Sequence, residues 1–346
     1  MTEPTVDAFL LLSFGGPQGP DDVLPFLRNV TAGRGIPDER LAEVAEHYLH
    51  FGGISPITAQ NEALLAAIEA EFGRRGIELP VYFGNRNWHP LLAEATGRLV
   101  ADGRRHALVL ATSATGSYSG CRQYREDLAG ALATVGSDRL QFTKLRHYFD
   151  HPGFIAANVA AVRAALASLP AELREDARLV FTAHSIPVSM NDTAGPSGGL
   201  YLAQHRATAR LIAESVRGAG ADFDLVWQSR SGPPQVPWLE PDINQHLRSL
   251  AEAGSRAVVV APSGFVSDHL EVLWDLDEEA RATAAELGLA FVRAATAGID
   301  PAFVSGLVDL VAEQLTGQPT ESLSELGICG WQCPADCCPA PVRRPR

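Results

Sequence analysis

The stretch FVSDHLEVLWDLDEEA, residues 265–280, carries six acidic side chains and neither lysine nor arginine. Four of its carboxylates recur at spacings of three, four and four residues, which places them along one face of a helix. Like charges at this spacing repel one another, and a divalent cation bound by their oxygens would offset the repulsion. The pattern indicates a path for a metal ion or for protons. We call these four residues the acidic ladder: Asp268, Glu271, Asp275 and Glu279.

The acidic ladder also has a purely structural interpretation. Asp268 can cap the helix, with Glu271 completing a capping box, and acidic residues in a first turn suit the helix dipole. Charge runs of this kind are most often solvated helix faces. The stretch alone leaves both interpretations open.

A histidine, His184, follows an apolar run in the sequence FTAHSIP. The end of such a strand borders the ligand crevice of a doubly wound sheet, so the position suits a functional side chain. A lone histidine can equally be structural and donate to a backbone carbonyl. If His184 faces Glu271, the pair supplies a base and an acidic ligand, which suits the exchange of a metal for protons.

The cysteines fall into two groups, one isolated residue and one cluster. Cys121 stands alone, and the others lie within the last 18 residues. In a reducing compartment such clustering favours a metal site over disulfides. Four thiolates suit zinc and an iron–sulfur cluster equally well by count. The clustered cysteines are Cys329, Cys333, Cys337 and Cys338.

The elements that must position these side chains alternate between strands and helices. Short apolar runs, typical of buried parallel strands, are separated by amphipathic stretches, and this βαβ pattern predicts an α/β fold. The alternation restarts near Asp150, so we expect domains at 1–150 and 151–318 and a Cys-rich tail at 319–346. The expected strands cover residues 8–14, 80–85, 106–113, 178–185, 224–229, 256–264 and 289–294.

The amino-acid composition limits which partners and which cellular compartment we expect. A hydrophobic content of 46% with 20% charged residues is typical of a globular protein, and the net charge of −13 disfavours nucleic acid and anionic membranes as partners. The N-terminal apolar run lacks the basic flank of a signal peptide, and every 18-residue window contains charged or strongly polar side chains. We therefore expect a cytoplasmic protein without a membrane span, and a monomer.

A series of motifs along nearly the whole chain resembles the motifs of ferrochelatases, in the same order. They are SFGGP, HFGGISPI, GNRNWHP, FTAHSIP, WQSRSGPP followed by WLEPD, and GFVSDHLEVLWD. The resemblance implies an enzyme that inserts ferrous iron, its substrate, into a porphyrin without using a nucleotide. It also implies two similar Rossmann-like domains, each with a mainly parallel sheet flanked by helices, and a cleft between them.

The resemblance also implies roles for single residues. His184 matches the family's invariant histidine and Glu271 its catalytic glutamate, and both are expected to contact the metal. Asp275 and Glu279 would form a path for protons or cations. Phe14 stands where relatives carry Tyr or Met, and a phenyl ring cannot bind iron, which favours metal delivery from the side of His184 and Glu271.

Four residues match porphyrin-contacting positions, and three of them have a structural alternative. Ser55 can instead cap the following helix, Tyr124 can fill the core, and Arg34 can be a solvated surface residue. The porphyrin-binding candidates are Phe14, Arg34, Ser55 and Tyr124.

Some ferrochelatases hold a [2Fe-2S] cluster with three C-terminal cysteines and one distant cysteine, which Cys121 resembles. The resemblance implies Cys329 and Cys333 as ligands, and Cys338 rather than its competitor Cys337, because the gap from Cys333 to Cys338 resembles the family's spacing. Such a cluster would pin the tail onto the first domain.

The porphyrin is less defined than the reaction. The Arg-rich, Lys-poor composition resembles actinobacterial chains, and chelatases of that group use coproporphyrin III. Protoporphyrin IX is the alternative substrate, and a non-catalytic metal or iron–sulfur binding protein is the alternative function.

Overall fold

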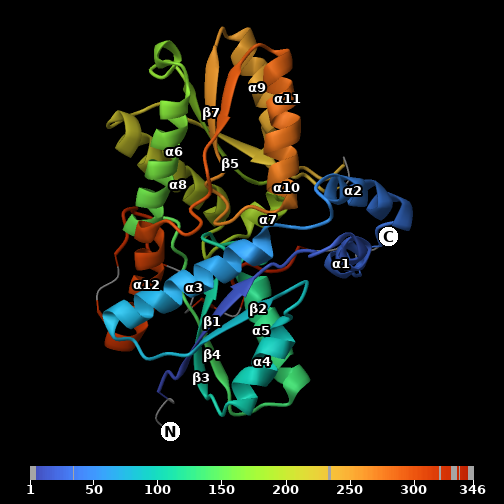
Figure 1. The fold of residues 1–346 in the computed structure, drawn as a ribbon, viewed down its shortest axis with the longest axis vertical. Coiled ribbons are helices and arrows are strands. Elements are labelled where there is room, and N and C mark those ends of the chain that lie inside the picture. Colours follow the sequence, from blue (N-terminus) through green and yellow to red (C-terminus); the bar gives the residue numbers. More distant parts are fainter. Residues whose placement is uncertain are drawn as a thin grey trace. The chain divides into compact units, whose positions relative to one another are not determined.

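The computed structural model describes residues 5–33, 35–232, 235–318, 321–328, 333–334 and 336–341. Along these residues strands and helices alternate (Figure 1). The strands are β1 (Ala8–Ser13), β2 (Val81–Asn85), β3 (His106–Ala111), β4 (Gln141–Lys144), β5 (Arg178–His184), β6 (Asp224–Gln228), β7 (Ala257–Ala261) and β8 (Ala290–Arg293). The α-helices are α1 (Val23–Val30), α2 (Asp38–His50), α3 (Ile57–Arg75), α4 (Leu92–Ala101), α5 (Gln123–Val135), α6 (Pro152–Ser168), α7 (Val188–Asp192), α8 (Leu200–Arg217), α9 (Ile243–Glu252), α10 (Leu270–Val272), α11 (Arg281–Glu286) and α12 (Pro301–Thr316). Shorter segments are the 3-10 helices η1 (Pro20–Asp22) and η3 (Ala171–Leu173) and the π-helices η2 (Tyr118–Arg122) and η4 (Leu273–Ala280).

Within the described residues the strands form two four-stranded parallel sheets, in the orders β2–β1–β3–β4 and β6–β5–β7–β8. Both sheets have the same order when each is numbered from its first strand, so one doubly wound arrangement occurs twice. The switch point of each sheet, where the strand order reverses, lies between β1 and β3 and between β5 and β7. The predicted α/β fold with two similar Rossmann-like parts is confirmed.

Strand β4 was not predicted from the sequence. Its four residues, QFTK, include a single large apolar side chain, and the strand lies at the edge of the first sheet. Edge strands are short and partly solvated, so they lack the continuous apolar run that marks the central strands β1 and β3.

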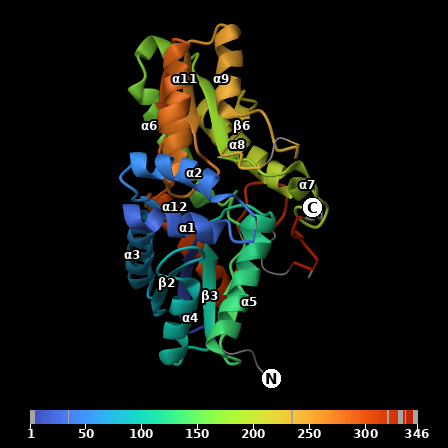
Figure 2. The ribbon, with the colours of Figure 1, turned by 90° about the vertical axis from the view of Figure 1, so that its right-hand side faces the viewer.

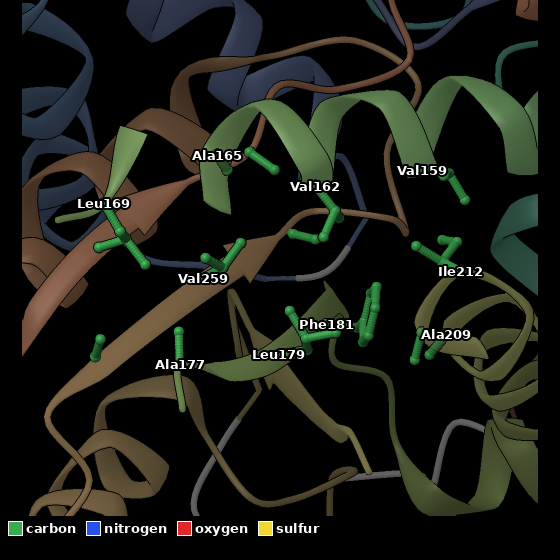
Figure 3. Close-up of a cluster of buried hydrophobic side chains, with 14 of the residues drawn as sticks. Val159, Val162, Ala165, Leu169, Ala177, Leu179, Phe181, Ala209, Ile212 and Val259 are labelled. Atoms are coloured by element: carbon green, nitrogen blue, oxygen red, sulfur yellow. The ribbon is translucent and has the colours of Figure 1, made fainter. Parts of the chain in front are cut away.

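A buried apolar cluster joins the second sheet to helices α6 and α8 (Figure 3). Leu179 and Phe181 of β5 and Val259 of β7 meet Val162 of α6 and Ile212 of α8, and each of these side chains is at most 1% exposed. Helices α9 and α11 lie side by side in both ribbon views, on the side of β7 opposite α6 (Figures 1 and 2). This packing fixes β5, whose last residue is His184.

The chain divides into two compact units. Unit 1 comprises Met1–Thr112, Tyr124–Leu145 and Ser267–Trp274, and unit 2 comprises Ser113–Gln123, Arg146–Val266 and Asp275–Arg346. The domain division proposed from the sequence, at residues 150 and 318, stays a prediction. No helix in the part of the chain that the structure describes has the length and apolar character needed to cross a membrane.

Candidate functional site

His184 is the last residue of β5, at the switch point of the second sheet. Its Nδ1 lies 2.6 Å from the carbonyl oxygen of Ser185, and its own carbonyl oxygen accepts a hydrogen bond from the Tyr201 hydroxyl at 2.9 Å. A carbonyl oxygen can only accept, so Nδ1 carries the proton in this contact. The lone pair of the neutral ring therefore resides on Nε2, the nitrogen that can take a proton or bind a metal.

Asp275 is held by the end of the neighbouring strand β6. Its Oδ2 accepts hydrogen bonds from Gln228 Nε2, at 3.2 Å, and from the hydroxyl of Ser229. The Thr182 hydroxyl donates to Gln228 Oε1 at 2.9 Å, which turns the amide NH2 group of Gln228 toward the carboxylate. Ser229 has a φ of 60°, a conformation that costs free energy in a residue other than glycine and that clusters at functional sites. This network fixes the position of one carboxylate of the acidic ladder.

Three residues of the acidic ladder, Glu271, Asp275 and Glu279, lie on a helix that changes type, and Asp268 precedes this helix. The α-helical hydrogen bonds of α10 end at Val272, and Leu273–Ala280 is π-helical. Glu271 and Asp275 are partly buried, whereas Glu279 is exposed, so the last carboxylate of the ladder is the most accessible to solvent. Segments of π-helix are rare and occur frequently at functional sites.

The prediction that Asp268 caps this helix is wrong. The N-cap residue is His269, which makes no side-chain capping hydrogen bond, and Glu271 is then the second helical residue. The backbone N–H of Asp268 donates instead to Gln60 Oε1 of α3, at 2.7 Å. A side chain of another helix therefore satisfies the orphan donor that a capping box would have satisfied.

The porphyrin candidates of unit 1 lie at different depths. Phe14 directly follows β1 and is 39% exposed, with its ring edge-on to Phe26. Ser55 is 4% exposed and packs against Gly16. Helix α3 begins after Pro56 without a side-chain cap, so the alternative role of Ser55 as a cap is wrong.

Tyr124 is a member of the first hydrophobic core and is 4% exposed. The Arg86 guanidinium lies 4.5 Å from the centre of its ring and 5.9 Å from that of Phe14, and it is paired with Asp127. The structural alternative for Tyr124 therefore agrees with its position. Arg34 lies outside the described residues.

Cys121 lies in unit 2, together with the tail, although the sequence placed it in the first domain. It is buried in η2, and its neighbour Arg122 donates to the carbonyl oxygen of Cys337 at 3.3 Å. These contacts lie within unit 2, and the hypothesis that a cluster pins the tail onto the first domain stays a prediction.

The 113–123 loop, which carries Cys121, is fixed to α8 by buried hydrogen bonds. Gly116 N donates to Gln204 Oε1 at 2.6 Å, and the Thr115 hydroxyl lies 3.3 Å from His205 Nε2. Burial lowers the pKa of His205 to about 3, so the ring is neutral at physiological pH. The position of the loop is therefore set by groups in the core of unit 2.

The sulfur atoms of Cys337 and Cys338 are 3.7 Å apart. A disulfide requires about 2.0 Å, whereas two sulfurs bound to one tetrahedral metal at 2.3 Å are separated by about 3.8 Å. Burial, together with the neighbouring thiols of Cys338 and Cys333, raises the pKa of Cys337, and a bound metal would reverse this effect. Gly195 N donates to the sulfur of Cys338 at 3.1 Å.

These thiols fit a metal or cluster site, but the set is incomplete in the described residues. No group of three or more His, Cys, Asp or Glu residues among them is arranged to hold a metal ion. Cys329 lies outside the described residues, and Cys337 and Cys338 are both buried, so burial does not separate the two competitors.

The first described part of the Cys-rich tail, residues 321–328, is held by the buried carboxylate of Asp150. We call this stretch the strap. The backbone N–H of Ser324 and the hydroxyls of Ser322 and Ser324 all donate to Asp150 Oδ2. Asp150 is 1% exposed, so these donors supply the hydrogen bonds that water would otherwise make to its carboxylate.

Sequence reasoning missed Arg86, Gln228 and Ser229. All three belong to motifs that carried the resemblance, GNRNWHP and WQSRSGPP, but the motifs alone do not tell which side chains point toward the acidic ladder or Phe14. The structure places Ser229 and Gln228 on Asp275 and Arg86 on Phe14. His184 belongs to unit 2 and Glu271 to unit 1, so their pairing stays a prediction.

Similar folds occur in solved chelatase structures. SirB from Bacillus subtilis with Fe3+ matches with a TM-score of 0.55 at 10% identity, over 90% of this chain and 97% of that chain. The sirohydrochlorin chelatase SirB from Bacillus subtilis subspecies spizizenii in complex with cobalt matches with a TM-score of 0.52. At this identity the likeness shows the fold alone.

Sequence comparison is more specific. A coproporphyrin III ferrochelatase of Nocardia farcinica is 58% identical over 348 residues, covering 98% of both chains. One of Streptomyces coelicolor is 56% identical over 355 residues, covering 98% of this chain and 95% of that protein. The profile of the ferrochelatase family matches residues 6–315. The chain belongs to the ferrochelatase family.

Proposed function

We propose that this protein inserts Fe2+ into coproporphyrin III during haem biosynthesis. Family membership and the names of relatives at 54–58% identity support both the reaction and the porphyrin. The observation that carries the mechanism is the oriented imidazole of His184, with Nδ1 committed to the carbonyl oxygen of Ser185.

Iron insertion requires the pyrrole N–H protons to leave as the metal enters, so the enzyme needs a base beside the macrocycle. Nε2 of His184 would accept these protons, or hold the incoming iron together with Glu271. A fixed tautomer supports this role, because a general base must present its lone pair in a defined direction. A bent macrocycle would expose the nitrogen lone pairs to the metal.

The acidic ladder would carry protons or cations between Glu271 and the surface. The burial gradient supports this proposal, since Asp275 is partly buried and hydrogen-bonded while Glu279 is exposed. The net charge of −13 favours the approach of a cationic metal substrate.

Phe14, Arg34, Ser55 and Tyr124 remain our candidates for contacts with the porphyrin. The exposed ring of Phe14 supports a stacking contact. Ser55 and Tyr124 are each 4% exposed, so only a small contact area is assigned to each of them.

We also propose that Cys121, Cys329, Cys333 and either Cys338 or Cys337 hold a [2Fe-2S] cluster. The sulfur separation of 3.7 Å, the thiols grouped around Cys337 and the donor from Gly195 support a thiolate-bound metal group. When bound, such a group would offset part of the negative charge of the thiolates and cross-link the tail to the 113–123 loop.

The test of the reaction is loss of free-porphyrin fluorescence with Fe2+ under anaerobic conditions. We expect wild-type protein to consume coproporphyrin III faster than protoporphyrin IX, and His184→Ala and Glu271→Gln to lose at least about a hundredfold in rate. Glu278→Gln, which neutralises an exposed carboxylate of the same helix outside the acidic ladder, is the matched control and should retain activity. Normal turnover in both site variants would refute the assignment.

The alternatives give different results in the same assay. A protoporphyrin IX ferrochelatase would prefer the dicarboxylate porphyrin. A non-catalytic metal or iron–sulfur protein would bind iron and leave both porphyrins fluorescent.

A further inference from the structure

Trp274, at the start of η4, is enclosed by aromatic rings of α2 and the residue after it. The ring of His47 stacks on the indole with a centroid distance of 3.9 Å and an interplanar angle of 7°. His50 and Phe51 meet the indole edge-on, at 5.7 and 6.4 Å. His47 and His50 lie in the last turn of α2, so one helix end provides both imidazoles.

The same part of unit 1 also holds the residues on either side of Glu271. Leu270, which is 3% exposed, is a member of a small core formed with α1 and α2, and Leu273 packs against that core. The stacked Trp274 follows directly. Residues of α1 and α2 therefore contact the chain on both sides of Glu271. The α-helical hydrogen bonds change to π-helical ones at the same place.

We infer that His47 is a positioning residue for Glu271 and acts through the stacked ring of Trp274. Glu271 lies three residues before Trp274, about one helical turn away, so the orientation of the indole and that of the carboxylate are set by the same turn. A chain adopts an α-helical turn more readily than a π-helical one. Contacts from outside the helix must therefore stabilise the π-helical turn. The ring of His47 is such a contact. This inference rests on the proposed function, because it assigns Glu271 to the iron step.

The test separates the ring of His47 from its charge and its hydrogen bonds. His47→Ala removes the stacked ring, whereas His47→Phe keeps an aromatic face on the indole. We expect His47→Ala to lower kcat and raise KM for Fe2+, with a combined loss on the order of tenfold, and to leave KM for the porphyrin unchanged. His47→Phe should recover most of the loss. Glu46→Gln, an exposed neighbour on α2, is the matched control.

A second readout needs neither porphyrin nor iron. The emission of Trp274 is obtained by subtracting, for each variant, the spectrum of the same variant carrying Trp274→Phe. We expect His47→Ala to shift this component to longer wavelength, because the indole loses its cover, and His47→Phe to leave it near the wild-type position. In the double variant His47→Ala with Trp274→Ala, the kinetic loss should equal that of Trp274→Ala alone.

The outcomes are distinguishable. Wild-type kinetics in His47→Ala, failure of His47→Phe to recover activity, or additive losses in the double variant would each overturn the inference. If wild-type protein itself makes no metalloporphyrin, the proposed function fails and the inference fails with it. If His47→Ala still shifts the Trp274 emission to longer wavelength in that case, the stacking is present and only the proposed reaction is wrong.

Discussion

The buried ion pair between Arg146 and Glu313 should contribute strongly to the stability of unit 2. Arg146 Nε and Nη2 contact Glu313 Oε2 and Oε1 at 2.9 and 2.8 Å, and the side chains are 3% and 8% exposed. The same guanidinium donates to the carbonyl oxygens of His147 and Glu321, at 3.1 and 2.7 Å. Arg146 thus ties the segment after β4 to α12 and to the first residue of the strap.

The size of the effect follows from burial. Glu313→Leu leaves a buried guanidinium without its counter-charge, which costs about 3–5 kcal/mol in the free energy of unfolding. Coulomb attraction of roughly 4 kcal/mol for unit charges 4 Å apart at an effective dielectric constant of 20 gives the same scale. Arg146→Met should cost a similar amount. The double variant should lose only about 2 kcal/mol, because it removes both charges and leaves two carbonyl groups without their donor.

The assay is urea unfolding followed by far-UV circular dichroism. With a slope of about 1–3 kcal/mol per molar urea, either single variant should shift the midpoint by more than about 1 M. The double variant should lie between wild type and the single variants. If its loss instead equals the sum of the two single losses, the two charges are not coupled and the reasoning is wrong.

The remaining predictions concern the acidic ladder, a buried histidine and the strap. Ser229→Ala removes one donor from Asp275 and should lower kcat for iron insertion about tenfold without changing KM for the porphyrin; unchanged kcat would contradict the network. Lowering the pH from 7 to 5.5 should cost about 1.3 kcal/mol through His205. Its pKa of about 3 in the fold lies below the unfolded value near 6.5, so only the unfolded chain takes up the proton. This contribution should disappear in His205→Gln, and urea unfolding at both pH values checks it. Asp150→Asn weakens the attachment of the strap and should lower the free energy of unfolding by about 1–3 kcal/mol, measured by urea unfolding; an unchanged free energy would contradict these hydrogen bonds.

Much of the fold could be predicted because apolar runs mark buried parallel strands. The strands ending at Ser13 and His184 are mainly apolar, and their ends were expected to carry the site. Strand β4 has no such run and was missed. The sequence pattern could not show that the 113–123 loop belongs to unit 2, because its attachment depends on Gln204 and His205, which lie far along the chain.

The site was only partly predictable, for a different reason. Residue types identified His184 and the acidic ladder, but types do not report hydrogen-bond partners. The π-helical turn, the capping position of His269 and the contact between Ser229 and Asp275 depend on backbone geometry that several sequences can adopt. Tyr124 illustrates a further difficulty, because the sequence does not distinguish a tyrosine that fills a core from one that contacts a ligand.

The excursion of the 113–123 loop into unit 2 constrains the order in which the protein can be completed during synthesis. Gly116 and Thr115 emerge from the ribosome 88 and 90 residues before their partners Gln204 and His205, and Arg122 emerges 215 residues before Cys337. Closing such long loops is slow, because their entropy must be lost before the contacts form. A fragment that starts at Arg146 would leave the Gln204 carbonyl buried without its donor. Unit 2 is therefore expected to complete its folding only after Cys337 has left the ribosome.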